Sequence, residues 1–116
     1  NIENSVILLS GDKGVSVGEN SSIKINNTQI KSNEIGIASK DSSLAEINNS
    51  IFSSNKIHLN VYKKNWRYGS SGSIVAKNSK FNVSNKNFLS DKNGKIIIDN
   101  SNYIKSIESS GNVIFK

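Results

Sequence analysis

One short segment of the chain concentrates the residue types that hold ligands by ring stacking and by charge. It runs from Tyr62 to Gly72 and contains the only Trp, the only Arg and two of the three Tyr of the sequence. Aromatic rings stack on flat ligand faces, and a guanidinium binds a carboxylate or sulfate through two hydrogen bonds. His58 alternates with Tyr62 in the stretch before it, so we expect both to project outward beside the segment. The predicted ligand-binding residues are His58, Tyr62, Lys63, Lys64, Trp66, Arg67 and Tyr68.

Three interpretations compete for this patch. In the first, Trp66 and Tyr68 fold back over apolar side chains such as Val75 or Ile97, which makes them packing residues. In the second, the rings stack on sugars while the three cations of the segment reach carboxylates or sulfates. The third is single-stranded nucleic acid, which also combines rings with cations. The other Lys residues are scattered and mark no continuous basic groove, so we predict no nucleic-acid partner.

Residues suited to catalysis are sparse. Hydrolysis of a glycosidic bond needs two carboxyl groups roughly 5 to 9.5 Å apart, whereas the nine Asp and Glu residues are spread along the whole chain. Asp12 and Asp41 lie in GDKG and KDSS stretches, which are typical of turns. With no Cys and a single His, the chain has no ligand set for zinc. We therefore predict no catalytic residue, no metal and no cofactor, and the sequence favours a protein without enzymatic activity.

The overall composition narrows the class of protein. The 116 residues carry a formal net charge of +6, which favours anionic partners. The absence of Cys excludes a disulfide framework, and no apolar run approaches the ~18 residues of a membrane span. Among 19 Asn and 22 Ser, the 17 Ile residues occur in short, regularly spaced clusters. Such clusters between polar turns predict many short β-strands and no helix.

An internal repeat sets the elements that carry these residues. Five Asn residues, each followed by Ser or Thr, recur at spacings of 23, 22, 29 and 22. These anchor residues are Asn4, Asn27, Asn49, Asn78 and Asn100. In most repeats, apolar residues stand four and two positions before the anchor, three after it and ten after it. The longest interval contains an inserted loop, residues 62–72.

This pattern predicts three short strands in every repeat. A unit of about 22 residues cannot bury its own apolar face, so successive units must stack. Stacked at the strand spacing of about 4.8 Å, they form a parallel β-helix of about five coils. The expected interior stacks are Ile25, Ile47, Ala76 and Ile98 in one column and Phe52, Phe81 and Tyr103 in another.

The anchor Asn column has a structural explanation. Asn tolerates the left-handed backbone that a sharp bend between two strands requires. Stacked Asn side chains also hydrogen-bond from one coil to the next, as in cross-β ladders. We therefore expect the five anchors to form a structural ladder at a corner rather than a binding site.

The stretch from Ile23 to Ile37, IKINNTQIKSNEIGI, resembles the repeat of right-handed parallel β-helix proteins. That group includes pectate-lyase-like and other polysaccharide-active enzymes, phage tailspikes and many bacterial surface proteins. The resemblance implies a single all-β domain over residues 1–116, as a fragment of a longer protein. Lyases of the pectate type pair a calcium-binding carboxylate cluster with a basic residue. His58, Lys63 or Arg67 would be that base, but the acid cluster is missing.

These observations predict a non-catalytic structural or carbohydrate-binding β-helix module of an extracellular or cell-surface protein from a bacterium or phage. Its partner would be an anionic polysaccharide or another envelope component, beside neighbouring coils or domains of the same chain. The alternative is a fragment of a polysaccharide lyase or hydrolase whose catalytic acids lie in coils outside this segment. Predicted strands reach both ends of the sequence, so we also expect it to continue into further coils or to associate end to end.

Overall fold

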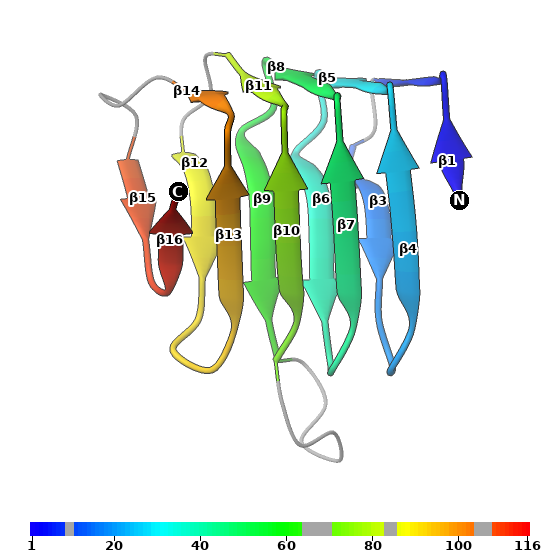
Figure 1. Ribbon diagram of the computed structural model, residues 1–116. Helices are drawn as coiled ribbons and strands as arrows, with labels where there is room; N and C mark the ends of the chain where they lie inside the picture. Colours follow the sequence, from blue (N-terminus) through cyan, green and yellow to red (C-terminus); the bar gives the residue numbers. More distant parts are fainter. Residues whose placement is uncertain (9–10, 64–70, 83–85, 104–107) are drawn as a thin grey trace.

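The computed structural model describes residues 1–8, 11–63, 71–82, 86–103 and 108–116 (Figure 1). Within these ranges the chain is all β-structure, with strands β1 to β16 and no helix. The strands form three sheets, and neighbouring strands within each sheet are parallel. This arrangement is consistent with a parallel β-helix or solenoid, as the sequence predicts.

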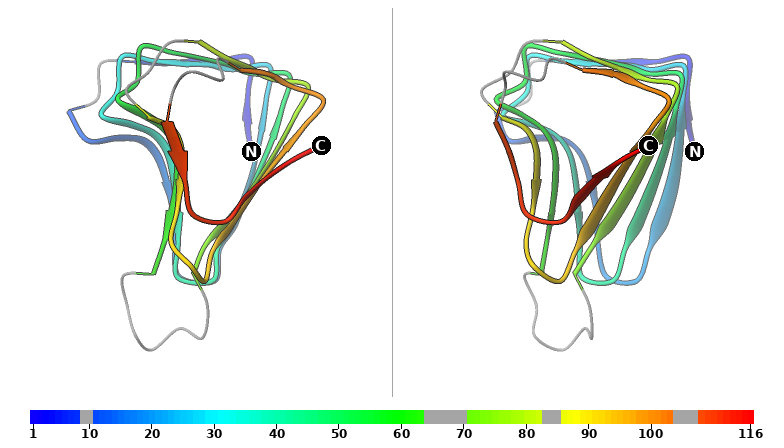
Figure 2. Two further views of the ribbon diagram at one scale, coloured as in Figure 1. Left: turned by 90° about the vertical axis from the view of Figure 1, so that its left-hand side faces the viewer. Right: turned by 60° about the vertical axis from the view of Figure 1, so that its left-hand side comes forward.

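Each sheet takes every third strand of the chain. Sheet A has the order β1 (Ile2–Glu3), β4 (Ser22–Asn26), β7 (Leu44–Asn48), β10 (Ser73–Lys77), β13 (Lys95–Asp99) and β16 (Val113–Phe115). Sheet B contains β2 (Val6–Leu8), β5 (Gln29–Lys31), β8 (Ile51–Ser53), β11 (Lys80–Phe81) and β14 (Asn102–Tyr103). Sheet C contains β3 (Lys13–Val17), β6 (Ile35–Lys40), β9 (Ile57–Tyr62), β12 (Lys86–Ser90) and β15 (Glu108–Ser110). Both views of Figure 2 show successive turns of the chain stacked behind one another.

The predicted aliphatic column lies in the interior beneath sheet A. Ile25 pairs with Ile47, Ile47 with Ala76, and Ala76 with Ile98. All four side chains are buried, whereas Glu46, beside Ile47 on β7, faces outward and is half-buried. Burying one isoleucine side chain contributes about 1.5–3 kcal/mol, and its β-branched shape suits a pleated strand. The register proposed from the anchor spacing is therefore confirmed.

The predicted aromatic column is confirmed as well. Phe52 pairs with Phe81, and Phe81 with Tyr103, in sheet B. The rings of Phe52 and Phe81 stack with their centroids 4.8 Å apart, and Phe88 from sheet C meets Phe81 edge-on at 4.9 Å. The three Phe side chains are fully buried or nearly so. Because ring separation matches the strand spacing of about 4.8 Å, each repeat can add one ring without disturbing the ladder.

The chain turns from sheet A to sheet B at the five anchor Asn residues. Their φ angles lie between 46° and 52°, which is the left-handed backbone expected at this bend. Each anchor N–H donates to a carbonyl of the neighbouring repeat. The Asn27 N–H bonds the carbonyl of Asn48, and the Asn49 N–H bonds that of Lys77, both at 3.1 Å. The bend therefore joins successive repeats while it redirects the chain.

Replacing Ile47 by Asp is expected to abolish folding, because an unpaired charge in the buried column costs several kcal/mol or more. Glu46→Lys, one residue away on the outer face, is the matched control and is expected to change stability by less than about 0.5 kcal/mol. Thermal unfolding followed by circular dichroism measures both variants. Equal melting temperatures would contradict the register described above.

Candidate functional site

The structure describes only the edges of the predicted ligand-binding segment. Tyr62 is the last residue of β9 and is half-buried, and Lys63 follows it and is exposed. At the other edge, Ser71 is buried and its carbonyl accepts a hydrogen bond from the N–H of Ser42 at 3.2 Å. The remaining predicted ligand-binding residues lie outside the described residues, so their roles stay predictions. These are Lys64, Trp66, Arg67 and Tyr68.

Asp91 fixes the point at which this segment leaves sheet C. Its Oδ2 accepts from the backbone N–H of Lys63 at 2.9 Å, and its Oδ1 accepts from the N–H of Asn93 at 3.2 Å. The Asp91 N–H in turn donates to the carbonyl of Val61 at 3.1 Å. One carboxylate thus joins the end of β9 to the turn after β12. Its two oxygens serve the backbone, which is a structural role rather than a catalytic one.

The expectation that His58 projects outward beside Tyr62 is wrong. The His58 side chain is fully buried, with its ring centroid 5.9 Å from that of Phe52 and 5.8 Å from that of Phe81. The cause is an irregularity in β9, where His58 and the next residue, Leu59, both point inward. Strict alternation of side chains, on which the expectation rested, does not hold across that step. His58 is therefore a core residue and does not belong to the exposed patch.

A hydrogen-bond network fixes the orientation of the imidazole. Asn55 Oδ1 accepts from the backbone N–H and the Nδ2 of Asn33, at 3.0 and 3.1 Å. Its Nδ2 donates to the carbonyl of Ile30 at 3.0 Å. These backbone groups set the orientation of the Asn55 amide. Its Nδ2 therefore donates to His58 Nδ1 at 3.1 Å, and that ring nitrogen is the acceptor. The Nε2 then carries the hydrogen and donates to the carbonyl of Asn82 at 2.7 Å.

The same surroundings keep His58 neutral. Burial lowers the pKa of His58, and this desolvation outweighs the hydrogen bond to the Asn82 carbonyl, which raises it. A second proton on Nδ1 would also face the Nδ2–H donor of Asn55. In the preceding repeat Gly36 leaves room for the network, since a Cβ there would lie 2.6 Å from the His58 carbonyl oxygen and 3.3 Å from Asn55 Nδ2. Both ring nitrogens are occupied, so His58 has no nitrogen available as a general base.

The residue after each anchor Asn has a role that the sequence did not reveal. The Thr28 N–H donates to Ser50 Oγ at 3.2 Å. The Ser50 N–H donates to Ser79 Oγ at 3.2 Å, and the Ser79 N–H donates to Ser101 Oγ at 3.0 Å. Each of these hydroxyls also donates to the carbonyl two residues before it. This hydroxyl ladder explains why Ser or Thr follows every anchor. The sequence shows that pattern but not its structural cause.

The anchor side chains form fewer hydrogen bonds with one another than the expected ladder requires. Asn100 Nδ2 donates to Asn78 Oδ1 at 2.6 Å. This is the one direct bond between anchor side chains within the described residues; elsewhere the backbone and the hydroxyl ladder hold the corner. The amides of the corner are therefore only partly used by the fold.

Comparisons with protein-family models, with curated proteins and with solved structures found no significant match to this chain. Among the residues that the structure describes, no group of three or more His, Cys, Asp or Glu residues is placed to hold a metal ion. In the same residues, no helix is long and apolar enough to cross a membrane.

The protein is expected to become less stable as the pH is lowered, because of His58. Its folded-state pKa lies below the ordinary value of 6.5, so below about pH 6.5 the unfolded chain binds a proton that the folded chain does not. The stabilisation is complete above that pH and is lost as the pH falls toward the folded-state pKa, at up to about 1.4 kcal/mol per pH unit. Urea unfolding at about pH 7.5, 6.5 and 5.5 measures this slope. A His58→Asn variant should lack the slope in this window, and a wild type with constant stability across it would contradict the buried, neutral imidazole.

Proposed function

We propose that this chain is a non-catalytic module, a right-handed parallel β-helix of about five coils, that binds an anionic polysaccharide at a cell surface. The observation that supports the binding role most directly is the net charge of +6. The stack that carries this charge has a buried core that a substrate does not reach. The only His is buried and neutral, so the excess charge belongs to Lys and Arg. A surface of this sign attracts polyanions.

Two features support the β-helix within this proposal. Every third strand joins the same sheet, with six strands in sheet A and five in each of the others. Crossover connections between parallel strands are right-handed in nearly all proteins, which favours the right-handed form. The anchor bends and the hydroxyl ladder recur once per repeat, as a helical stack requires.

The state of the acidic residues supports a role without catalysis. Asp91 has both oxygens on backbone N–H groups. Asp12 pairs with Lys13, and Glu34 with Lys56, each at 3.1 Å. Such exposed pairs stabilise little, and they give both carboxylates a cation as partner. The alternative, a fragment of a polysaccharide lyase or hydrolase with its acids elsewhere, stays a prediction with no described residue that favours it.

Affinity electrophoresis of the 116-residue chain in gels containing polygalacturonate or neutral dextran tests the proposal. We expect retardation by polygalacturonate alone, weakening as salt rises because exposed charges are screened within about 10 Å at 0.1 M salt. The polymer recovered from the gel should keep its length. Equal migration in both gels would contradict the binding role, and shortened polygalacturonate would contradict the absence of catalysis.

The insertion at residues 62–72 remains the predicted contact with sugar rings. Trp66→Ala and Arg67→Ala are expected to weaken retardation while leaving the melting temperature almost unchanged, because a ring that stacks on a ligand is not needed for the core. Affinity electrophoresis and thermal unfolding of the two variants measure this. A loss of about 3 kcal/mol or more for Trp66→Ala would instead mark the Trp as a packing residue.

A further inference from the structure

A groove of about 750 Å³ runs along the corner between sheets A and B. It crosses three successive repeats, and each contributes its anchor residue to the lining: Asn49, Asn78 and Asn100. Its volume lies within the range of about 300–1,000 Å³ that is usual for ligand sites. The groove lies on the corner that the sequence assigned to structure alone.

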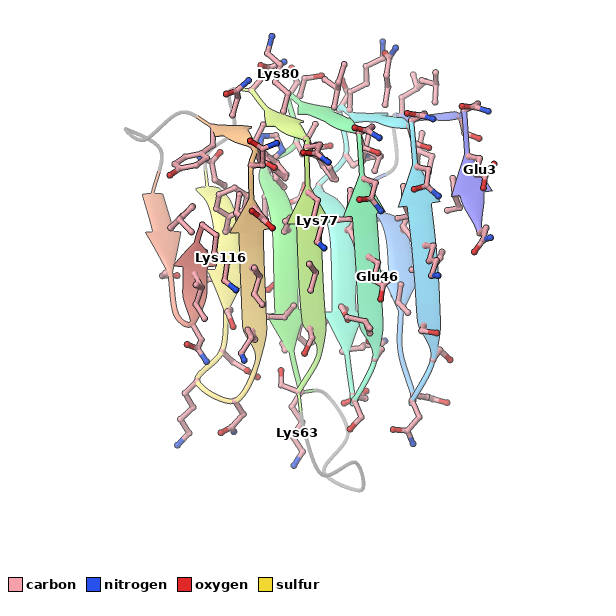
Figure 3. The ribbon with its side chains drawn as sticks, in the orientation of Figure 1. Glu3, Glu46, Lys63, Lys77, Lys80 and Lys116 are labelled. Atoms are coloured by element: carbon pink, nitrogen blue, oxygen red, sulfur yellow. The ribbon has the colours of Figure 1, made fainter. Side chains whose placement is uncertain are left out.

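The charged side chains of the groove are all basic. Lys80 and Lys116 belong to its lining, and none of its lining side chains is acidic. Neither Lys forms an ion pair with any residue that the structure describes. Lys80 lies on β11, at the top edge of the molecule in Figure 3, and its side chain extends away from the ribbon. A ligand in this groove therefore meets cations that the fold does not use.

The corner amides provide a second kind of contact. The Ser hydroxyls beneath them are occupied by the hydroxyl ladder, so they are not available to a ligand. The bond from Asn100 Nδ2 to Asn78 Oδ1 leaves the Nδ2 of Asn78 as a donor and the Oδ1 of Asn100 as an acceptor. Side-chain amides that both donate and accept match hydroxyl groups, which also do both. A phosphate polymer offers acceptors only, so it would leave the Asn acceptors without partners.

Apolar surface is present as well. Ile51 is 42 % exposed and lines the groove. Half-buried Tyr103 also lines it, and its ring packs on that of Phe115 with the centroids 4.7 Å apart. Cations, amides that both donate and accept, and a small apolar surface together suit a sugar that carries a carboxylate. Because the anchors recur at a strand spacing of about 4.8 Å, the groove presents one anchor amide from each of three successive repeats.

We propose that this corner groove binds an extended, uronate-bearing polysaccharide. Lys80 pairs with a carboxylate, Asn78 and Asn100 bond to hydroxyls, and Ile51 contacts the apolar side of a sugar. The proposal rests on the proposed function and assigns a site to it. This site is separate from the insertion, because Lys63 and Lys80 lie at opposite ends of the strands in Figure 3.

The test is calorimetric titration of the 116-residue chain with oligogalacturonate, with a neutral galactose oligomer and polyphosphate as comparison probes. Lys80→Glu is expected to weaken oligogalacturonate binding about tenfold or more, as loss of a charge-assisted bond does. Asn78→Gly is expected to weaken it a few-fold, since Gly keeps the left-handed backbone while removing the amide. The matched controls are Lys24→Glu, on β4 of sheet A, and Asn27→Gly, an anchor outside the groove lining. Both controls should bind like the wild type.

Each other outcome has a distinct meaning. Equal weakening by a groove variant and its control would overturn the groove as a site, because net charge or corner stability would then explain the loss. Binding that depends on Trp66 and Arg67 but not on Lys80 or Asn78 would overturn the groove and leave the proposed function intact. Equal binding of polyphosphate would overturn the assignment to a polysaccharide. No binding of oligogalacturonate by the wild type would overturn both proposals.

Discussion

The left-handed turn at the anchor Asn is the interaction on which the rest of the structure depends. At this residue the chain passes from sheet A to sheet B, and the Asn N–H bonds a carbonyl one repeat further along, at 3.1 to 3.3 Å at all five anchors. The hydroxyl of the following residue then accepts an N–H from the repeat before it. Two consecutive residues thus satisfy backbone groups that a bend would otherwise leave unpaired, each at a cost of about 1–3 kcal/mol. The strands on either side of the corner pair in the same register as the corner itself.

The interior shows how that register constrains packing away from the corner. Between sheets B and C the core contains polar side chains, and a buried polar group must be hydrogen-bonded to be tolerated. Asn33 and Asn55 meet this requirement by bonding to each other and to backbone groups, and His58 takes its place at the end of the same network. The network requires Gly36 in the repeat before His58, because a side chain there would collide with the His58 carbonyl. A hydrophobic periodicity alone does not encode such a dependence between repeats.

Much of the fold could be predicted from the sequence, because it depends on repetition. The Ile25 column, the Phe52 column and the left-handed anchors all follow from residues at constant offsets, and the structure places them as expected. Prediction failed where the residue types give no signal. His58 and Leu59 are both buried and break the inward-outward alternation, as Asn87 and Phe88 do in the next repeat. Ser32 and Ser54 adopt positive φ at a second corner that Ser does not signal.

Of the two candidate sites, one could be predicted from the sequence and the other could not. The insertion stands out in the sequence by its rare residues, of which Trp66 and Arg67 lie outside the described part of the chain. The corner groove has no such signal, because the three runs that form most of its lining, 49–51, 78–80 and 100–103, lie far apart in the sequence and consist mostly of common residue types. Only the stacking of repeats brings Asn49, Asn78 and Asn100 together, so a site of this kind becomes visible once the register is known.

Native-state hydrogen exchange at the corner amides tests the central claim most directly. The N–H groups of Thr28, Ser50 and Ser79 bond to hydroxyls of the neighbouring repeat rather than to strand carbonyls. If the corner holds the register, these three amides exchange only when the whole stack opens, with the same free energy as the slowest amides of sheet A. Exchange at the rate of unprotected turn amides, while the strands stay protected, would show that the sheets hold together without the corner and would contradict this account.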